Sequence, residues 1–149
     1  MTTEASNSTA ERVVVGVDGS GHSRAALAWG ARQAELTGAS LTVVTTWELP
    51  TSYGYVAAWP ENVDFEADAR AVLEETVETV LGPDSSLEIT RRVERGHAAL
   101  VLVEESRRAA VVVVGCRGHG EFTGMLIGSV SEHLATHAHC PVVIVRGQH

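Results

Sequence analysis

Hydrophobic residues along the chain follow two patterns that alternate from one end to the other. Short runs rich in valine and threonine are typical of strands, and longer segments with apolar positions three or four apart are typical of helices. The predicted strands are residues 12–17, 41–47, 87–93, 110–114 and 141–146. The predicted helices are residues 23–36, 63–81, 97–108 and 129–137. Gly38 and the pair Gly82–Pro83 are expected to end the first two helices.

Strands that alternate with helices predict a parallel sheet. The segments 12–17 and 110–114 are almost wholly apolar, as in strands that are covered on both faces. We therefore expect an α/β, Rossmann-like fold, with a doubly wound, open, five-stranded parallel sheet and helices on both faces. The length of 149 residues fits one domain, which we expect over residues 12–147 after a disordered polar tail at residues 1–11.

Residues 48–62 follow the second predicted strand and contain Pro50, Gly54 and Pro60, so we expect a loop there. Its aromatic residues are Tyr53, Tyr55 and Trp59. Exposed aromatic side chains beside a cleft can form a lid or a partner surface, and they can equally pack on the neighbouring helix. The sequence leaves both interpretations open.

The net charge of −8 and the absence of a Lys/Arg cluster exclude nucleic acid and an anionic membrane as the main partner. No stretch of about 18 apolar residues is present, so no transmembrane helix is expected. The polar start of the chain does not resemble a signal peptide. Cys116 and Cys140 do not make a disulfide framework, which favours a reducing, cytoplasmic location.

The segment "GCRGHGEFTGMLIGSVSE" (115–132) places five glycines after the fourth predicted strand. Ligands of open α/β sheets bind beyond the carboxyl ends of the strands. Gly115 and Gly118 lack side chains and are therefore expected to let the loop approach a ligand. The segment has neither the lysine of a Walker A loop nor the spacing of a dinucleotide fingerprint. The alternative is that these glycines only form a tight turn.

The end of the same segment predicts a helix start. Ser129-x-x-Glu132 is a capping box, so Ser129 is expected to be the N-cap, directly after Gly128. A helix N-terminus presents free N–H groups and a partial positive charge, and both suit a phosphate group. The segment therefore offers an anion site within an acidic protein.

The spacing Gly115-x2-Gly118-x9-Gly128-Ser129 resembles the ATP-binding signature of the universal stress protein family. The resemblance covers about residues 12–146, because "VVVGVDGS" and "CPVVIVR" are similar to the family's first and last strands. It implies an adenine nucleotide alpha hydrolase-like fold with strand order 3-2-1-4-5. It also implies ATP as the ligand, with or without Mg²⁺, and a homodimer formed through the C-terminal strand.

The resemblance further implies a nucleotide site built from the ends of three strands and the start of the last helix. Its residues are Gly16, Val17, Asp18, Thr46, Val114, Gly115, Arg117, Gly118, Gly128, Ser129, Val130 and Ser131. Asp18 and Thr46 would lie near the adenosine, Arg117 would lie on the phosphate and ribose side, and residues 128–131 would hold the phosphates. Asp18 also has a simpler interpretation as a turn residue in "DGSG".

The function implied by the resemblance is a nucleotide-dependent regulator of the stress response, with at most slow ATP hydrolysis and an unidentified regulatory protein partner. The alternative is a stress-family interaction module that does not bind ATP. The sequence has no recognisable nucleophile–base–orienter set, so an enzyme is not expected. Two positions depart from many family members, which have Ser at Cys116 and an acidic residue at Ala110.

His133 and His137 lie four residues apart on the last predicted helix, with His139 and Cys140 beyond. A metal site is one interpretation, but "HLATH" lacks the Glu of H-E-x-x-H, and exposed helix histidines are the favoured one. Cys140 is interpreted as a small buried residue, and Cys116 as a redox-sensitive candidate in the binding loop.

Overall fold

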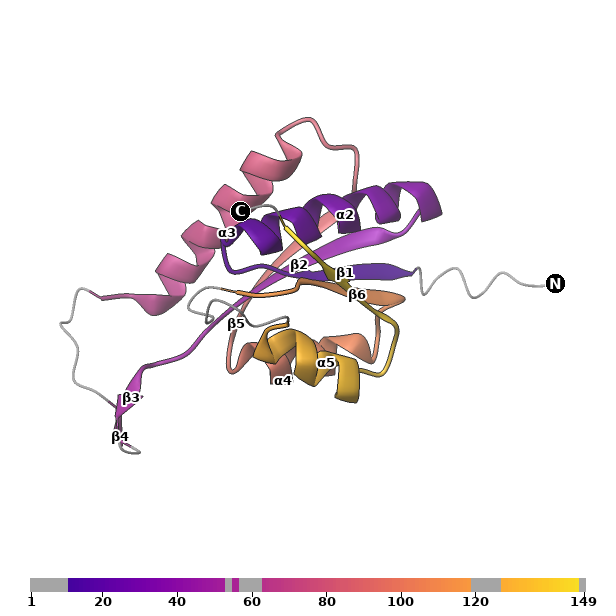
Figure 1. The fold of residues 1–149 in the computed structure, drawn as a ribbon. Helices are drawn as coiled ribbons and strands as arrows, with labels where there is room; N and C mark the ends of the chain where they lie inside the picture. Colours follow the sequence, from indigo (N-terminus) through magenta and orange to yellow (C-terminus); the bar gives the residue numbers. More distant parts are fainter. Residues whose placement is uncertain (1–10, 53–54, 57–62, 119–126, 148–149) are drawn as a thin grey trace.

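The computed structural model describes residues 11–52, 55–56, 63–118 and 127–147, and Figure 1 shows their arrangement. The strands are β1 (Arg12–Gly16), β2 (Ser40–Trp47), β3 (Thr51–Ser52), β4 (Tyr55–Val56), β5 (Ile89–Arg95), β6 (Val111–Gly115) and β7 (Val142–Val145). The helices are α2 (Gly21–Thr37), α3 (Phe65–Leu81), α4 (Ala98–Ser106) and α5 (Ser129–His137).

One five-stranded sheet has the order β5-β2-β1-β6-β7, and every neighbouring pair in it is parallel. Numbered along the chain, its strands stand in the order 3-2-1-4-5, which confirms the predicted fold class. β1 is central, because Val15 is paired with Val43 of β2 and with Val113 of β6. The strand order reverses between β1 and β6, so the loops that follow these two strands meet at the carboxyl edge of the sheet.

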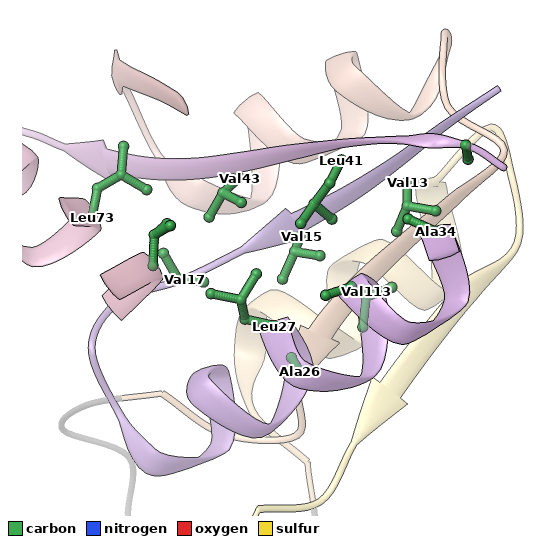
Figure 2. Close-up of a cluster of buried hydrophobic side chains, with 13 residues drawn as sticks. Val13, Val15, Val17, Ala26, Leu27, Ala34, Leu41, Val43, Leu73 and Val113 are labelled. Atoms are coloured by element: carbon green, nitrogen blue, oxygen red, sulfur yellow. The ribbon is translucent and has the colours of Figure 1, made fainter. Parts of the chain in front are cut away.

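Helices α2 and α3 cover one face of the sheet, and α4 and α5 cover the other (Figure 1). Successive side chains of a strand point to opposite faces. In β1, Val13 and Val15 belong to the core beneath α2 and α3, whereas Val14 belongs to the core beneath α4 and α5. Figure 2 shows the first of these cores, where Leu27 of α2 points toward the strand valines. The central strands are therefore buried on both faces, as their apolar runs predict.

The predicted helix ends are confirmed at both glycines. Gly38 adopts the left-handed conformation (φ 76°) after α2, and its N–H donates to the carbonyl of Ala34. Gly82 caps α3. β5 begins and ends two residues later than the predicted strand 87–93. β5 lies at an edge of the sheet and is only partly buried. Its alternation of hydrophobic and polar residues therefore defines the ends of the strand less clearly.

The prediction of an unstructured loop at residues 48–62 is partly wrong, because β3 and β4 form a short antiparallel pair there. Strands of two residues are too short to leave an alternating pattern in the sequence. Tyr53 and Trp59 lie outside the described residues, as do residues 1–10 of the predicted tail. None of the described helices is long and apolar enough to cross a bilayer.

Candidate functional site

A cavity of about 480 Å³ opens at the carboxyl ends of β1, β2 and β6. This volume lies within the range of small-molecule sites. All the residues that the sequence singled out for a nucleotide site line it. The structure thus brings together segments that are more than a hundred residues apart along the chain, from Gly16 to Ser131. Their part in binding a ligand stays a prediction.

Asp18 connects the two loops that meet at this edge. Its Oδ1 accepts a hydrogen bond from the N–H of Ser20 (3.0 Å), and its own N–H donates to Oγ of Ser23 (3.3 Å). The turn interpretation of Asp18 is therefore correct for one carboxylate oxygen. The other, Oδ2, faces the loop after β6, because a Cβ added to Gly118 would lie 2.5 Å from it. The carboxylate of Asp18 occupies the space that the side chain of any other residue at position 118 would need.

The sequence predicted that Gly115 leaves room for a ligand, but in the structure it leaves room for the backbone of His22. A Cβ at this position would lie 2.6 Å from the carbonyl carbon and 2.8 Å from the carbonyl oxygen of His22. The space beside Gly115 is therefore occupied by the first turn of α2, which packs directly against the end of β6. Gly115 still lines the cavity.

The start of α5 corrects the expected capping box. Gly128 is the N-cap, and its carbonyl accepts the first helical hydrogen bond, from the N–H of Glu132 (3.0 Å). Ser129 is therefore the first residue of the helix and not its N-cap. Among the described helices, α2, α3 and α4 are capped by side chains, whereas α5 has no side-chain cap. The capping residues of the other three are Ser20, Asp64 and His97.

Two hydrogen bonds hold the start of α5 against the end of β6. The N–H of Gly128 donates to the carbonyl of Cys116 (2.6 Å), and Oγ of Ser131 donates to the carbonyl of Gly115 (2.7 Å). The first turn of α5 lines the cavity. Its N–H groups and its partial positive charge therefore form a fixed site that suits an anion.

The cavity is lined by both polar and apolar side chains. Arg117 is the one basic side chain among the described lining residues, and it lies in the same loop as Gly118. The apolar part comes from both faces of the sheet. It includes Val17, Val44, Phe65, Val72, Ala98, Leu102 and Val114. Such a cavity fits a ligand with an anionic group and an uncharged, apolar body.

Sequence reasoning missed the wall that α3 contributes to the cavity. This wall consists of Phe65, Asp68, Ala69 and Val72, which lie at helical spacing along one face of α3. It also missed Thr45, the neighbour of Thr46 on β2. The spacing of the α3 residues was visible in the sequence. However, only the packing of α3 on the sheet shows that this face reaches beyond β2 into the site.

The other candidate residues are the histidines of α5 and the two cysteines. The rings of His133 and His137 lie 4.4 Å apart, and the described residues contain no group of three His, Cys, Asp or Glu side chains that could hold a metal ion. Cys116 is buried, with Sγ 3.5 Å from Nδ1 of His22. Burial raises the pKa of the Cys140 thiol, against the opposing effect of a hydrogen bond with the backbone of Val112. Both cysteines are free thiols.

The fold and the cavity define an α/β domain with a ligand-sized site at the point where the strand order reverses. Residues 9–146 match the sequence profile of the universal stress protein family. The chain therefore belongs to the universal stress protein family.

Relatives with curated sequences include universal stress protein Rv2623 of Mycobacterium tuberculosis, which is 37% identical over 149 residues. A universal stress protein of Mycolicibacterium smegmatis is 36% identical over 138 residues. The alignments cover 91% and 90% of this chain but only 48% and 45% of those proteins. The chain thus spans about half the length of these relatives.

Two solved structures show the shared fold. UspA from Lactobacillus plantarum superposes with a TM-score of 0.73 at 18% identity, covering 91% of this chain and 97% of that one. A universal stress protein solved in complex with cAMP superposes with a TM-score of 0.70 at 26% identity, covering 94% and 99%. The cAMP is bound in that structure, and the comparison shows no ligand for this chain.

Proposed function

We propose that this protein binds ATP and acts as a nucleotide-dependent regulator in the stress response, with at most slow hydrolysis. One observation carries the proposal. The first turn of α5, whose N-cap Gly128 has no side chain to cap it, lines one cavity together with the described part of the loop after β6 and with apolar side chains. A nucleotide has the matching parts, because its phosphates are anionic and its base is flat and largely apolar.

The family relationship favours an adenine nucleotide over other ligands of this shape. The structure with 26% identity was solved with cAMP, which shares the adenosine part of ATP. The site also has groups that a longer phosphate chain needs, namely Arg117 and the N–H groups of the first turn of α5. For ATP that carries Mg²⁺, Asp18 is the carboxylate that lies against the loop at Gly118.

The alternative is a family member that acts through protein contacts alone. A module of that kind has no need for a cavity of about 480 Å³ with an anion site at one end, so we favour the nucleotide-binding function. We also propose that the protein works in the cytoplasm on a protein partner, not on nucleic acid or a membrane. The acidic charge of −8 and the two free thiols support that proposal.

The test is to purify the protein, denature it and identify released nucleotides by mass spectrometry, and then to titrate the nucleotide-free protein with ATP in a calorimeter. We expect adenine nucleotide in the released fraction and saturable heat on titration. Protein that releases none and gives no heat with ATP would show that the proposal is wrong.

We further propose a homodimer in which β7 pairs with its copy. β7 is an edge strand. The carbonyls of Pro141 and Val145 accept from β6, at 3.0 and 2.8 Å. By alternation, the backbone groups of Val142 and Ile144 point to the open edge, where a second copy can pair with them.

Light scattering is expected to give twice the chain mass of 15.8 kDa for the wild type. Ile144→Pro removes one edge N–H and is expected to give a monomer, because proline cannot donate to a strand partner. Circular dichroism checks that the variant is folded. A wild-type monomer, or a folded Ile144→Pro dimer, would contradict pairing through β7.

A further inference from the structure

The side chain of His22, in the first turn of α2, lies where the ends of β6 and β7 meet. Its Nδ1 accepts a hydrogen bond (2.7 Å) from the N–H of Gly147, which follows β7. A Cβ added to Gly147 would lie 2.6 Å from Cα of His22, so the two backbones are closely packed. The backbone of Gly115, at the end of β6, packs against His22 in the same way. His22 therefore joins the start of α2 to the ends of two strands.

The contacts of His22 define which of its ring nitrogens carries the proton. A backbone N–H can only donate, so Nδ1 is an acceptor and the proton of the neutral ring is on Nε2. Sγ of Cys116 lies 3.5 Å from the same Nδ1, and Cys116 is only 4% exposed. One ring nitrogen thus contacts both the segment after β7 and the loop after β6.

Cys116 connects His22 with the start of α5. Its N–H donates to the carbonyl of Val145 at the end of β7 (2.8 Å), and its carbonyl accepts from the N–H of Gly128, the N-cap of α5 (2.6 Å). Cys116 thus contacts β7, His22 and α5 through three different groups. Neither His22 nor Cys116 lines the cavity, whereas Gly128 and the first turn of α5 do.

We propose that His22 is a positioning residue for the anion site at the start of α5. Its hydrogen bond to Gly147 holds the end of β7 and the loop at Cys116 in the arrangement that places the first turn of α5 for a ligand. Release of Gly147 from His22 then weakens binding, and a bound ligand in turn favours the hydrogen bond, because coupling between two sites is reciprocal. This inference rests on the proposed function and adds a residue that acts on the ligand without touching it.

Two variants separate the hydrogen bond of His22 from the bulk of its ring. His22→Asn places an acceptor oxygen close to the position of Nδ1, whereas His22→Phe keeps a ring and has no acceptor. His97→Phe is the matched control. Nδ1 of His97 also accepts from a backbone N–H, that of Ala99 (3.2 Å), and His97 does not line the cavity.

Calorimetric titration with ATP and with adenosine is the first measurement. His22→Phe is expected to weaken ATP by about 5-fold and adenosine by less than about 2-fold, because adenosine has no phosphates to meet the anion site. His22→Asn should bind both ligands like the wild type, and His97→Phe should leave the ratio of the two affinities unchanged. Circular dichroism checks that each variant is folded.

Amide hydrogen exchange in the wild type, followed by NMR, is the second measurement. Saturating ATP should slow exchange of the Gly147 amide by about the same 5-fold factor, as reciprocal coupling requires. The Gly38 amide, which donates to the carbonyl of Ala34 at the other end of α2, should be unaffected. This measurement needs no variant, so it tests the coupling even where His22→Phe does not fold.

Four results would each overturn the inference. A folded His22→Phe protein binds ATP within about 2-fold of the wild type, or it loses affinity for ATP and adenosine equally. His22→Asn loses as much affinity for ATP as His22→Phe does. ATP leaves the exchange of the Gly147 amide unchanged relative to that of Gly38. These results leave the proposed function intact, whereas a wild type that binds no adenine compound would refute that function and this inference together.

Discussion

Replacing Gly128 by valine is expected to weaken ATP binding by about 100-fold while the protein stays folded. Gly128 is buried, lines the cavity and is fixed in place by its N–H bond to the carbonyl of Cys116 (2.6 Å). An added isopropyl group is therefore expected to narrow the part of the cavity beside the first turn of α5, where we propose that the phosphates bind. The estimate corresponds to the loss of about two charge-assisted hydrogen bonds.

The backbone of Gly128 gives no reason for this variant to unfold. Its φ of −80° and ψ of 168° are extended values that valine adopts readily. Calorimetry with ATP and with adenosine is the matched measurement, because adenosine lacks the phosphates. We expect a large loss for ATP and a small one for adenosine. Unchanged ATP affinity in a folded Gly128→Val protein would show that the phosphates bind elsewhere.

The fold could be predicted from the sequence because its strongest signals are local. The apolar runs that became β1 and β6 mark strands covered on both faces, and Gly38 marks a helix end through its left-handed conformation. That the loops after β1 and β6 lie together was also predictable, since an alternating α/β chain places them at one edge of the sheet. The family resemblance added the order of the strands.

The rest of the site depends on contacts between distant segments. Gly115 is small because His22, far away in the sequence, packs against it, and no local pattern records that contact. The wall formed by α3 depends on how that helix crosses β2. The prediction that Ser129 is the N-cap is wrong because the N-cap is Gly128, whose N–H donates to the carbonyl of Cys116. Ser129 is therefore the first residue inside the helix.

An ion-pair bridge that we expect to stabilise the domain is formed by residues that do not line the cavity. The ligand cavity lies at the carboxyl ends of the strands. On the face of the sheet that α4 covers, Glu105 bridges two strands: its Oε1 lies 3.2 Å from Nη2 of Arg12 on β1, and its Oε2 lies 2.7 Å from Nη1 of Arg92 on β5. The Glu105 side chain is 5% exposed, so this carboxylate neutralises two arginines beneath the helix.

Replacing Glu105 by alanine is expected to lower the free energy of unfolding by about 3 kcal/mol, and the melting temperature by about 10 °C. The reason is that Arg12 and Arg92, whose side chains are only 24% and 34% exposed, would then lose their shared carboxylate, and only Arg92 keeps another one, Glu94 at 2.8 Å. Chemical denaturation monitored by circular dichroism measures the change.

Glu104 is the matched control for this variant. It neighbours Glu105 on the same helix and also pairs with an arginine, Arg107 at 3.3 Å, but its side chain is 64% exposed. Exposed ion pairs contribute at most about 1 kcal/mol, so Glu104→Ala is expected to change stability little. Equal losses in Glu104→Ala and Glu105→Ala would contradict the bridging role of Glu105. A loss confined to Glu105→Ala, with ATP affinity unchanged, is the expected result, because the bridge lies away from the cavity.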